Sequence, residues 1–315
     1  MTKQDVIIGV DIGGTKINFS CVQGEDISCE VVSLKTPGTA QGIMDTFCEG
    51  ITSLTAKYNV KAIGIATAGT VDLENSKVTG STGNLPDGYQ DLELKKVLEK
   101  EFKTPVFVEN DANAAAYAEY KTGSARGHNN TITLTLGTGI GGGIIVEGKL
   151  LRGRSGGGAE VGHMPMTPEK KRKCSCGAWD CWEIYASGTG YAINAREMAA
   201  EIPAGKREGI LKGKNISELT TYEIIAGLNN NDPFANKVHD LWEEYLSMGM
   251  ASLINIFEPD SIVLSGGMAK FVNYKILSGK IKERVVIAET RLIPAKFENF
   301  AGMLGAAYLA DEKFS

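Results

Sequence analysis

Two glycine-rich turns, each enclosed by short strands, constrain the fold of this chain more than any other sequence feature. The first turn lies between an apolar, β-branched run at 6–10 and an alternating segment at 17–22. The second lies between similar segments at 131–136 and 143–147. Each half of the chain therefore opens with a predicted strand–turn–strand unit, a weak internal repeat. Two such hairpins facing one another could hold a polyphosphate from both sides.

The first turn has the sequence Asp-Ile-Gly-Gly-Thr-Lys. Gly13 and Gly14 can take positive φ and expose their amides, so the turn could serve as a phosphate cradle. An ordinary hairpin turn is the simpler alternative. The turn is not a Walker A loop, because the spacing G-x-x-x-x-G-K-[ST] is absent and a strand follows where a helix should.

The second turn contains Gly137, Gly139 and Gly142 at the spacing G-x-G-x-x-G. A dinucleotide-binding fingerprint also needs a helix directly after its glycines. The residues that follow here, Ile-Ile-Val-Glu-Gly-Lys, predict a strand and a further turn instead. The sequence therefore excludes a dinucleotide site at this turn.

The size and charge of the chain limit the class of protein further. Its 315 residues suggest two domains, and its net charge of −5 argues against a nucleic-acid-binding surface. The first apolar run is interrupted by Asp11, which leaves it too short for a signal peptide or a membrane span, and no later run is long enough. We expect a cytoplasmic protein without nucleic-acid or membrane partners, whose thiols are reduced.

A polar pair stands where a predicted buried strand at 105–109 meets a predicted helix at 112–120. Ligands of α/β proteins bind beyond the carboxyl ends of strands, and a helix N-terminus stabilises a carboxylate. Asn110 and Asp111 are therefore candidate functional residues. The residues alone leave a second interpretation open, in which Asp111 is only the cap of the helix.

Three of the six cysteines, Cys174, Cys176 and Cys181, fall within eight positions. In a reducing compartment such a cluster favours a metal site over a cross-link. A closed zinc site takes four Cys or His ligands, and His163 is the histidine that precedes the cluster at loop distance. A reduced, unliganded loop and a vicinal disulfide are the alternatives.

The remaining cysteines and the basic run beside the cluster have simpler interpretations. Cys21, Cys29 and Cys48 are expected to be core or partly buried residues. The run 170–173, Lys-Lys-Arg-Lys, is expected to be a solvated loop face.

The motifs taken together resemble the ROK family, in the sugar-kinase branch of the actin/hexokinase/Hsp70-like ATPase fold. The two hairpins are similar to its two phosphate motifs. The likeness continues in family order through VENDANAAAYAE, GGGAEVGHMP, CSCGAWDCWE and IVLSGGM, so it covers nearly the whole chain. It implies an α/β, two-domain actin-like (ribonuclease H-like) fold with an interdomain cleft, which closes over the sugar to exclude water.

The resemblance also implies where the domains divide. A small N-terminal α/β domain is expected over residues 1–111, with a C-terminal helix at 301–315 packing on it. A large C-terminal α/β domain that contains the zinc loop is expected over residues 112–300.

The family's functional residues map onto this chain motif by motif. Asp111 corresponds to the general base that takes the proton from the attacking sugar hydroxyl. Asp11 is expected to help hold Mg²⁺. The other residues expected to bind the nucleotide are Gly13, Gly14, Thr15, Lys16, Thr138, Gly139, Gly266 and Gly267. Those expected to bind the sugar are Gly69, Asn84, Asn110, Asp111, Glu160, His163 and Glu183.

The family signature C-x-C-G-x-x-G-C-x-E, preceded by E-x-G-H, implies a structural zinc ion held by His163, Cys174, Cys176 and Cys181. The zinc would organise the sugar pocket and take no part in phosphoryl transfer. Two departures stand out: Asp180 where the family usually has glycine, and Thr67 and Thr70 around Gly69, where it usually has P-G-P-V-D.

The function implied is ATP-dependent phosphorylation of a hexose, most simply glucose to glucose 6-phosphate at the entry to glycolysis. N-acetylglucosamine or N-acetylmannosamine kinase and fructokinase are alternatives within that class. A sugar-sensing ROK regulator without turnover is the alternative from another class. The first core strand begins at Val6, which leaves no room for the helix-turn-helix of such repressors. The family suggests a homodimer or homotetramer.

Overall fold

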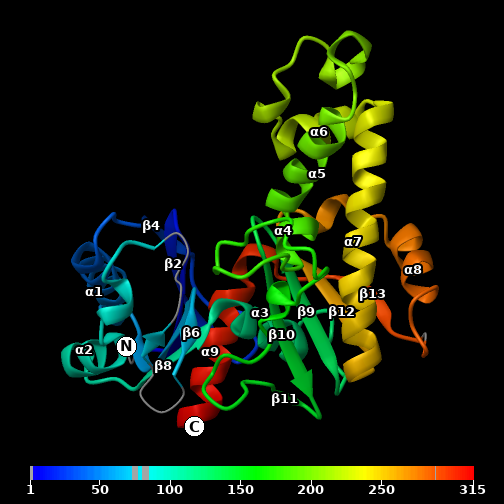
Figure 1. The fold of residues 1–315 in the computed structure, drawn as a ribbon. Coiled ribbons are helices and arrows are strands. Elements are labelled where there is room, and N and C mark those ends of the chain that lie inside the picture. Colours follow the sequence, from blue (N-terminus) through cyan, green and yellow to red (C-terminus); the bar gives the residue numbers. More distant parts are fainter. Residues whose placement is uncertain (1–2, 73–76, 80–84, 288) are drawn as a thin grey trace. The chain divides into compact units, whose positions relative to one another are not determined.

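The computed structural model describes residues 3–72, 77–79, 85–287 and 289–315 as a mixed α/β protein (Figure 1). Its contacts divide the chain into two compact units. The first unit comprises residues 1–133, 142–159 and 295–315, and the second comprises 134–141 and 160–294. Within the described ranges no helix combines the length and hydrophobicity needed to cross a membrane.

The first unit is built on a six-stranded sheet. Its order is β3-β2-β1-β5-β8, and β4 also pairs with β2. Strand β1 is antiparallel to β2 and parallel to β5, which is in turn parallel to β8. The six strands are β1 (Asp5–Ile12), β2 (Lys16–Gln23), β3 (Asp26–Ile27), β4 (Val32–Lys35), β5 (Asn59–Thr67) and β8 (Val106–Asn110). A separate small pair joins β6 (Thr70–Val71) to β7 (Val78–Thr79).

The first glycine turn connects β1 to β2, as predicted. The amide of Gly13 donates to the carbonyl of Lys16 at 2.9 Å. Thr36 fixes the turn from outside, through its hydroxyl to the carbonyl of Gly13 and its amide to the carbonyl of Thr15. The φ of Gly13 lies outside the left-handed region. Gly13 therefore does not use the positive φ that glycine allows, because these bonds hold the turn without it.

Four helices belong to the first unit: α1 (Ala40–Thr55), α2 (Leu94–Phe102), α3 (Asp111–Lys121) and α9 (Ala301–Phe314). Helix α9, red in Figure 1, is buried over most of its length and packs against α3, β1 and β5. Small residues allow this close approach. A Cβ at Gly305 would lie 1.7 Å from the carbonyl oxygen of Ala114, and one at Gly64 would lie 2.0 Å from that of Ala306.

A second sheet has the order β11-β10-β9-β12-β13. Its strands are β9 (Thr131–Leu136), β10 (Ile140–Val146), β11 (Lys149–Leu150), β12 (Ser261–Ser265) and β13 (Arg291–Pro294). A strand, not a helix, follows the second glycine turn. The exclusion of a dinucleotide fingerprint is therefore confirmed.

The helices of the second unit are α4 (Glu183–Ala186), α5 (Gly188–Ala200), α6 (Thr221–Asn229), α7 (Pro233–Phe257) and α8 (Tyr274–Lys282). The long helix α7, yellow in Figure 1, contacts the other four. Trp182 and Trp242 are fully buried in this packing. A Cβ at Gly249 would lie 2.1 Å from the Trp182 ring, so glycine is needed there.

The domain boundary expected between residues 111 and 112 stays a prediction. The compact units place residues 112–133 and 142–159 with the first sheet. A grouping by contacts need not follow the division between two domains, so it does not decide that boundary.

Candidate active site

The carboxyl end of β8 presents two polar side chains at its junction with α3. Asn110 is the helix cap, since its Oδ1 accepts the amides of Ala112 at 2.9 Å and Asn113 at 3.1 Å. The interpretation of Asp111 as the cap was therefore wrong. Asp111 is the first residue of α3, and its Oδ1 accepts the Ala112 amide at 2.8 Å. Asn110 also donates through Nδ2 to the carbonyl of Gly69 at 3.1 Å, which brings two predicted sugar residues together.

A buried ion pair lies behind this junction. Glu109 is 2% exposed and accepts Nε of Arg152 at 2.7 Å. It also accepts the amide of Asn110 at 3.0 Å and Nδ2 of Asn113 at 3.2 Å. Sequence reasoning missed Arg152. An acid on a buried strand indicates that a cationic partner exists, but not where it lies in the sequence.

Asp11, near the end of β1, is electrostatically linked to Asp111 in the same unit. Burial, followed by the charge of Asp111, raises the pKa of Asp11 to about 7. Gly302 of α9 keeps space beside it, because a Cβ there would lie 3.0 Å from Asp11 Oδ1. Two interacting carboxyl groups are the oxygen donors that Mg²⁺ prefers, so the residues present fit this ion. The turn that follows Asp11 is exposed at Gly13, Gly14, Thr15 and Lys16.

A second group of predicted sugar residues lies in the second unit. His163 Nε2 is 3.9 Å from Glu160 Oε2, and His163 Nδ1 is 3.8 Å from Glu183 Oε1. Glu183 Oε1 also accepts the thiol of Cys174 at 3.0 Å. The structure thus brings Glu160, His163 and Glu183 together. The predicted sugar residue Asn84 lies outside the described residues.

The four predicted metal ligands converge beside these acids. The ligand atoms of His163, Cys174, Cys176 and Cys181 all lie within 4.8 Å of one another. The thiols of Cys176 and Cys181 are 3.7 Å apart, and the thiol of Cys174 is 3.8 Å from His163 Nδ1. A tetrahedral zinc site separates its sulfur ligands by about 3.8 Å, given zinc–sulfur bonds of about 2.3 Å. The donor set and its spacing therefore fit zinc.

The loop that carries the cysteines is a small irregular ribbon with two isolated bridges, Pro165 to Cys181 and Lys173 to Trp179. Asp180, which departs from the family pattern, has φ of 55° and so keeps the left-handed backbone that glycine favours. Arg172 is 8% exposed. The prediction of a solvated face over 170–173 was therefore wrong at Arg172, whose charge is balanced by Glu197.

A cavity of about 660 Å³ lies wholly within the second unit. Loops and helix N-termini form much of its wall, and among its lining residues there are two cations, two aromatic rings and no carboxylate. The lining residues are Gly137, Thr138, Gly188, Thr189, Ala192, Arg196, Thr220, Thr221, Tyr222, Ile225, Gly267, Met268, Lys270 and Phe271. This size, charge and aromatic content suit an anionic ligand with a planar ring system, such as a nucleotide.

The cavity contains only part of the predicted nucleotide set. Thr138 and Gly267 line it, whereas Gly139 and Gly266 are absent from its described lining. Gly266 has φ of +87°, and a Cβ there would lie 2.5 Å from the carbonyl of Leu136, so the backbone requires glycine. A Cβ at Gly139 would lie 2.4 Å from Glu183 Oε2. The sequence missed the contribution of α6, since no local pattern links Tyr222 to the glycine turns.

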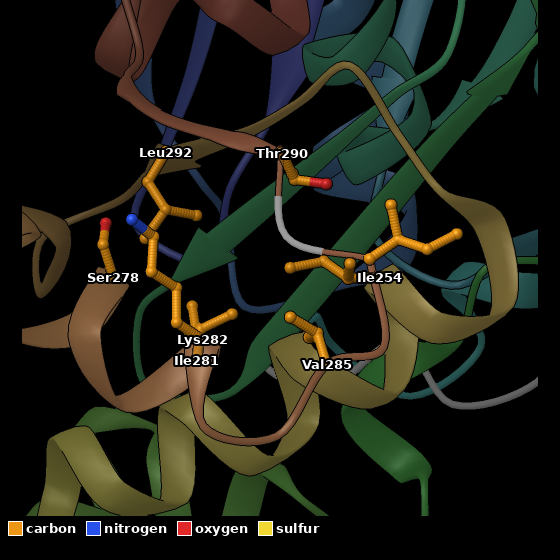
Figure 2. Close-up of a pocket in the computed structure, with 8 residues that line it drawn as sticks. Ile254, Ser278, Ile281, Lys282, Val285, Thr290 and Leu292 are labelled. Atoms are coloured by element: carbon orange, nitrogen blue, oxygen red, sulfur yellow. The ribbon is translucent and has the colours of Figure 1, made fainter.

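A second cavity, of about 30 Å³, lies among α7, α8 and β13 (Figure 2). Side chains such as Ile254, Ile281 and Leu292 form its wall. It has room for about one water molecule and none for a sugar or a nucleotide.

Comparison with known proteins identifies the family of this chain. Residues 7–313 match the ROK family. The glucokinase of Streptomyces coelicolor is 35% identical over 321 residues, covering 97% of each chain. A ROK family glucokinase from Streptomyces griseus, solved in complex with glucose and AMPPNP, is 33% identical, with a TM-score of 0.77 over 98% of this chain and 99% of that one. A ROK hexokinase from Thermus thermophilus is 31% identical, with a TM-score of 0.82 over the same shares.

The fold and these relatives define a sugar kinase with the two-domain actin-like ATPase fold. Within that class, the chain belongs to the ROK family.

Proposed function

We propose that this protein transfers the γ-phosphoryl group of ATP to glucose and so forms glucose 6-phosphate. The observation that carries the proposal is the junction of β8 and α3, where Asn110 caps the helix and the charge of Asp111 acts on Asp11. Relatives named glucokinase support glucose as the sugar. ATP, Mg²⁺ and a hexose are then the molecules that this chain binds in its reaction.

Asp111 is the proposed catalytic residue. It accepts the proton of the sugar hydroxyl as the hydroxyl oxygen attacks the γ-phosphorus, and the bond from that phosphorus to the β,γ-bridging oxygen breaks. Asn110, held by the carbonyl of Gly69 and by the α3 amides, fixes a neighbouring hydroxyl. Glu109 and Arg152 hold the junction in place from behind.

Asp11 is the residue proposed to help hold Mg²⁺. Bound Mg²⁺ would neutralise charge on the β- and γ-phosphates. In the second unit, the cavity that includes Thr138 and Gly267 is the proposed nucleotide site, where Arg196 and Lys270 supply positive charge. Gly13, Gly14, Thr15, Lys16, Gly139 and Gly266 stay predicted nucleotide residues.

The cysteine loop is proposed to hold a structural zinc ion through His163, Cys174, Cys176 and Cys181. Glu160 and Glu183 contact this cluster and are proposed sugar ligands. A thiolate-rich, four-ligand site closes the coordination shell and leaves no position for a reacting water. Its role would be to hold the sugar-binding side chains.

A coupled assay of ADP release across glucose, fructose, N-acetylglucosamine and N-acetylmannosamine tests the proposal. We expect the highest kcat/KM for glucose. A higher kcat/KM for another of these sugars would make that sugar the substrate and would leave the assignment as a sugar kinase unchanged. Calorimetric sugar binding without turnover on any of them would favour the alternative of a sugar-sensing regulator. Cytoplasmic location and a homodimeric or homotetrameric state remain expectations.

A further inference from the structure

The residue that departs from the family pattern, Asp180, makes a buried set of hydrogen bonds. Its side chain is fully buried. Oδ1 accepts the amide of Arg172 at 2.7 Å and the hydroxyl of Tyr185 at 2.7 Å. Oδ2 accepts the amide of Lys171 at 2.9 Å. A glycine at this position could keep the left-handed backbone but could make none of these bonds.

Arg172 extends the same network into two helices. Its Nη1 donates to the carbonyl of Ile184 at 3.0 Å and to Oδ1 of Asn194 at 2.9 Å. Its Nε and Nη2 bind the two carboxylate oxygens of Glu197 at 3.0 and 2.6 Å. The guanidinium also lies over the Tyr185 ring, 4.1 Å from its centroid. All three nitrogens of this planar fork therefore donate to α4 or α5.

These bonds converge on the helix turn that begins with Glu183. Ile184, which accepts from Arg172, and Tyr185, which donates to Asp180, follow Glu183 directly in α4. Asn194 of α5 closes the set by donating to the carbonyl of Tyr185 at 3.0 Å. The orientation of α4 sets where the Glu183 carboxylate lies, so the network acts on that carboxylate without touching it.

We propose that Asp180 is a positioning residue for the sugar: together with Arg172 it fixes α4, and hence Glu183, by bonds that use none of the four metal ligands. The inference rests on the proposed function, which makes Glu183 a sugar ligand. The loop is then held in two ways, by the metal site and by the network of Asp180 and Arg172, whose residues alternate along the sequence but share no side chain. Loss of Asp180 weakens sugar binding and leaves the metal in place.

Two variants separate this role from a general loss of stability. Asp180→Gly keeps the φ of 55° but removes all three bonds. Asp180→Asn also tolerates this backbone and keeps an oxygen at the Oδ1 position, but it turns an NH₂ group toward the Lys171 amide. Asp232→Gly is the matched control. Asp232 likewise accepts three hydrogen bonds, all from backbone amides, those of Ile210, Phe234 and Ala235.

Glucose KM, kcat, zinc content and melting temperature are measured for the wild type and these three variants. For Asp180→Gly we expect the glucose KM to rise about tenfold, the factor that one lost hydrogen bond to a charged group corresponds to. We expect an unchanged kcat and wild-type zinc content. We expect the glucose KM of Asp180→Asn to lie between those of the wild type and Asp180→Gly. Asp232→Gly is expected to lower the melting temperature with no change in KM.

Amide hydrogen exchange at residues 183–186 gives a readout that needs no turnover. Faster exchange at these residues in Asp180→Gly than in Asp232→Gly supports the network whichever sugar is the substrate. A finding that glucose is not the substrate would count against the proposed function alone. A wild-type glucose KM in folded Asp180→Gly overturns the inference. Loss of zinc together with the rise in KM overturns it as well. If Asp180→Gly does not fold, a wild-type KM and wild-type exchange in Asp180→Asn decide against it.

Discussion

The β8–α3 junction and the cysteine loop hold their functional side chains in opposite ways. At the junction, regular secondary structure does the positioning: β8 ends, Asn110 caps α3, and Asp111 follows in the first turn. In the loop, Glu160, His163 and Glu183 depend on a ribbon with two isolated bridges, four candidate metal ligands and a buried arginine. From this difference we expect the proposed chemistry and the proposed recognition of the sugar to be separately perturbable.

The largest expected effect comes from Asp111. Replacement by Asn removes the proton acceptor but keeps a hydrogen-bonding oxygen, so we expect kcat to fall by at least ~10²-fold, the scale of a lost general base. Coupled ADP release at saturating ATP and sugar measures it. Near-normal turnover in a folded Asp111→Asn protein would rule out Asp111 as the base.

The cysteine loop should respond in its metal content first. Cys176→Ser removes one of four ligands, so we expect zinc per chain to fall well below one and the sugar KM to rise. His163→Ala should do the same and also lose its contact with the sugar. Elemental analysis of the purified proteins measures the zinc. Cys48→Ser, a half-buried cysteine in α1, is the control and should keep the metal.

A variant in the proposed nucleotide cavity tests nucleotide binding more specifically than a variant in the second glycine turn does. A Cβ at Gly267 would meet nothing within 4 Å, and Gly267 lines the cavity, so we expect Gly267→Val to weaken ATP binding about tenfold and to spare the sugar. Gly139→Val should disturb both ligands, because its Cβ would meet Glu183. Calorimetry with each ligand distinguishes the two. Equal ATP affinity in wild type and Gly267→Val would place the nucleotide elsewhere.

The smallest expected effect is a pH dependence at Asp11. Its pKa is raised from 3.8 to about 7 in the folded protein, so folding favours the protonated form. Without Mg²⁺, its contribution to the free energy of unfolding is therefore present below about pH 4 and is lost as the pH rises to about 7. Urea unfolding of wild type and Asp11→Asn across this range measures it. Parallel pH profiles for the two proteins would show that Asp11 does not titrate there.

Sequence reasoning succeeded where a structure depends on neighbouring residues. The strands on either side of both glycine turns, the α3 helix and the buried Cys21 follow from local patterns of apolar and turn residues. The cluster of His163 with the three cysteines was also predicted and is confirmed as a spatial group.

The rest depends on partners that are distant in the sequence. Arg172 looks solvated among three lysines, yet Asn194 and Glu197 of α5 satisfy its guanidinium. Gly13 needs no positive φ because Thr36, in the connection between β4 and α1, fixes the turn through a hydrogen bond. Residues of α6 line the proposed nucleotide cavity because of how the helix packs, and no residue spacing within α6 predicts this.

The measurement that tests the account most directly is calorimetric glucose affinity in Asp111→Asn and Cys176→Ser, compared with wild type. We expect near-wild-type glucose binding in Asp111→Asn, because this variant keeps the cysteine loop intact. We expect weakened glucose binding in Cys176→Ser, because this variant loses zinc. The reverse order, with binding lost in Asp111→Asn and retained in zinc-free Cys176→Ser, would contradict the division of labour between the junction and the loop.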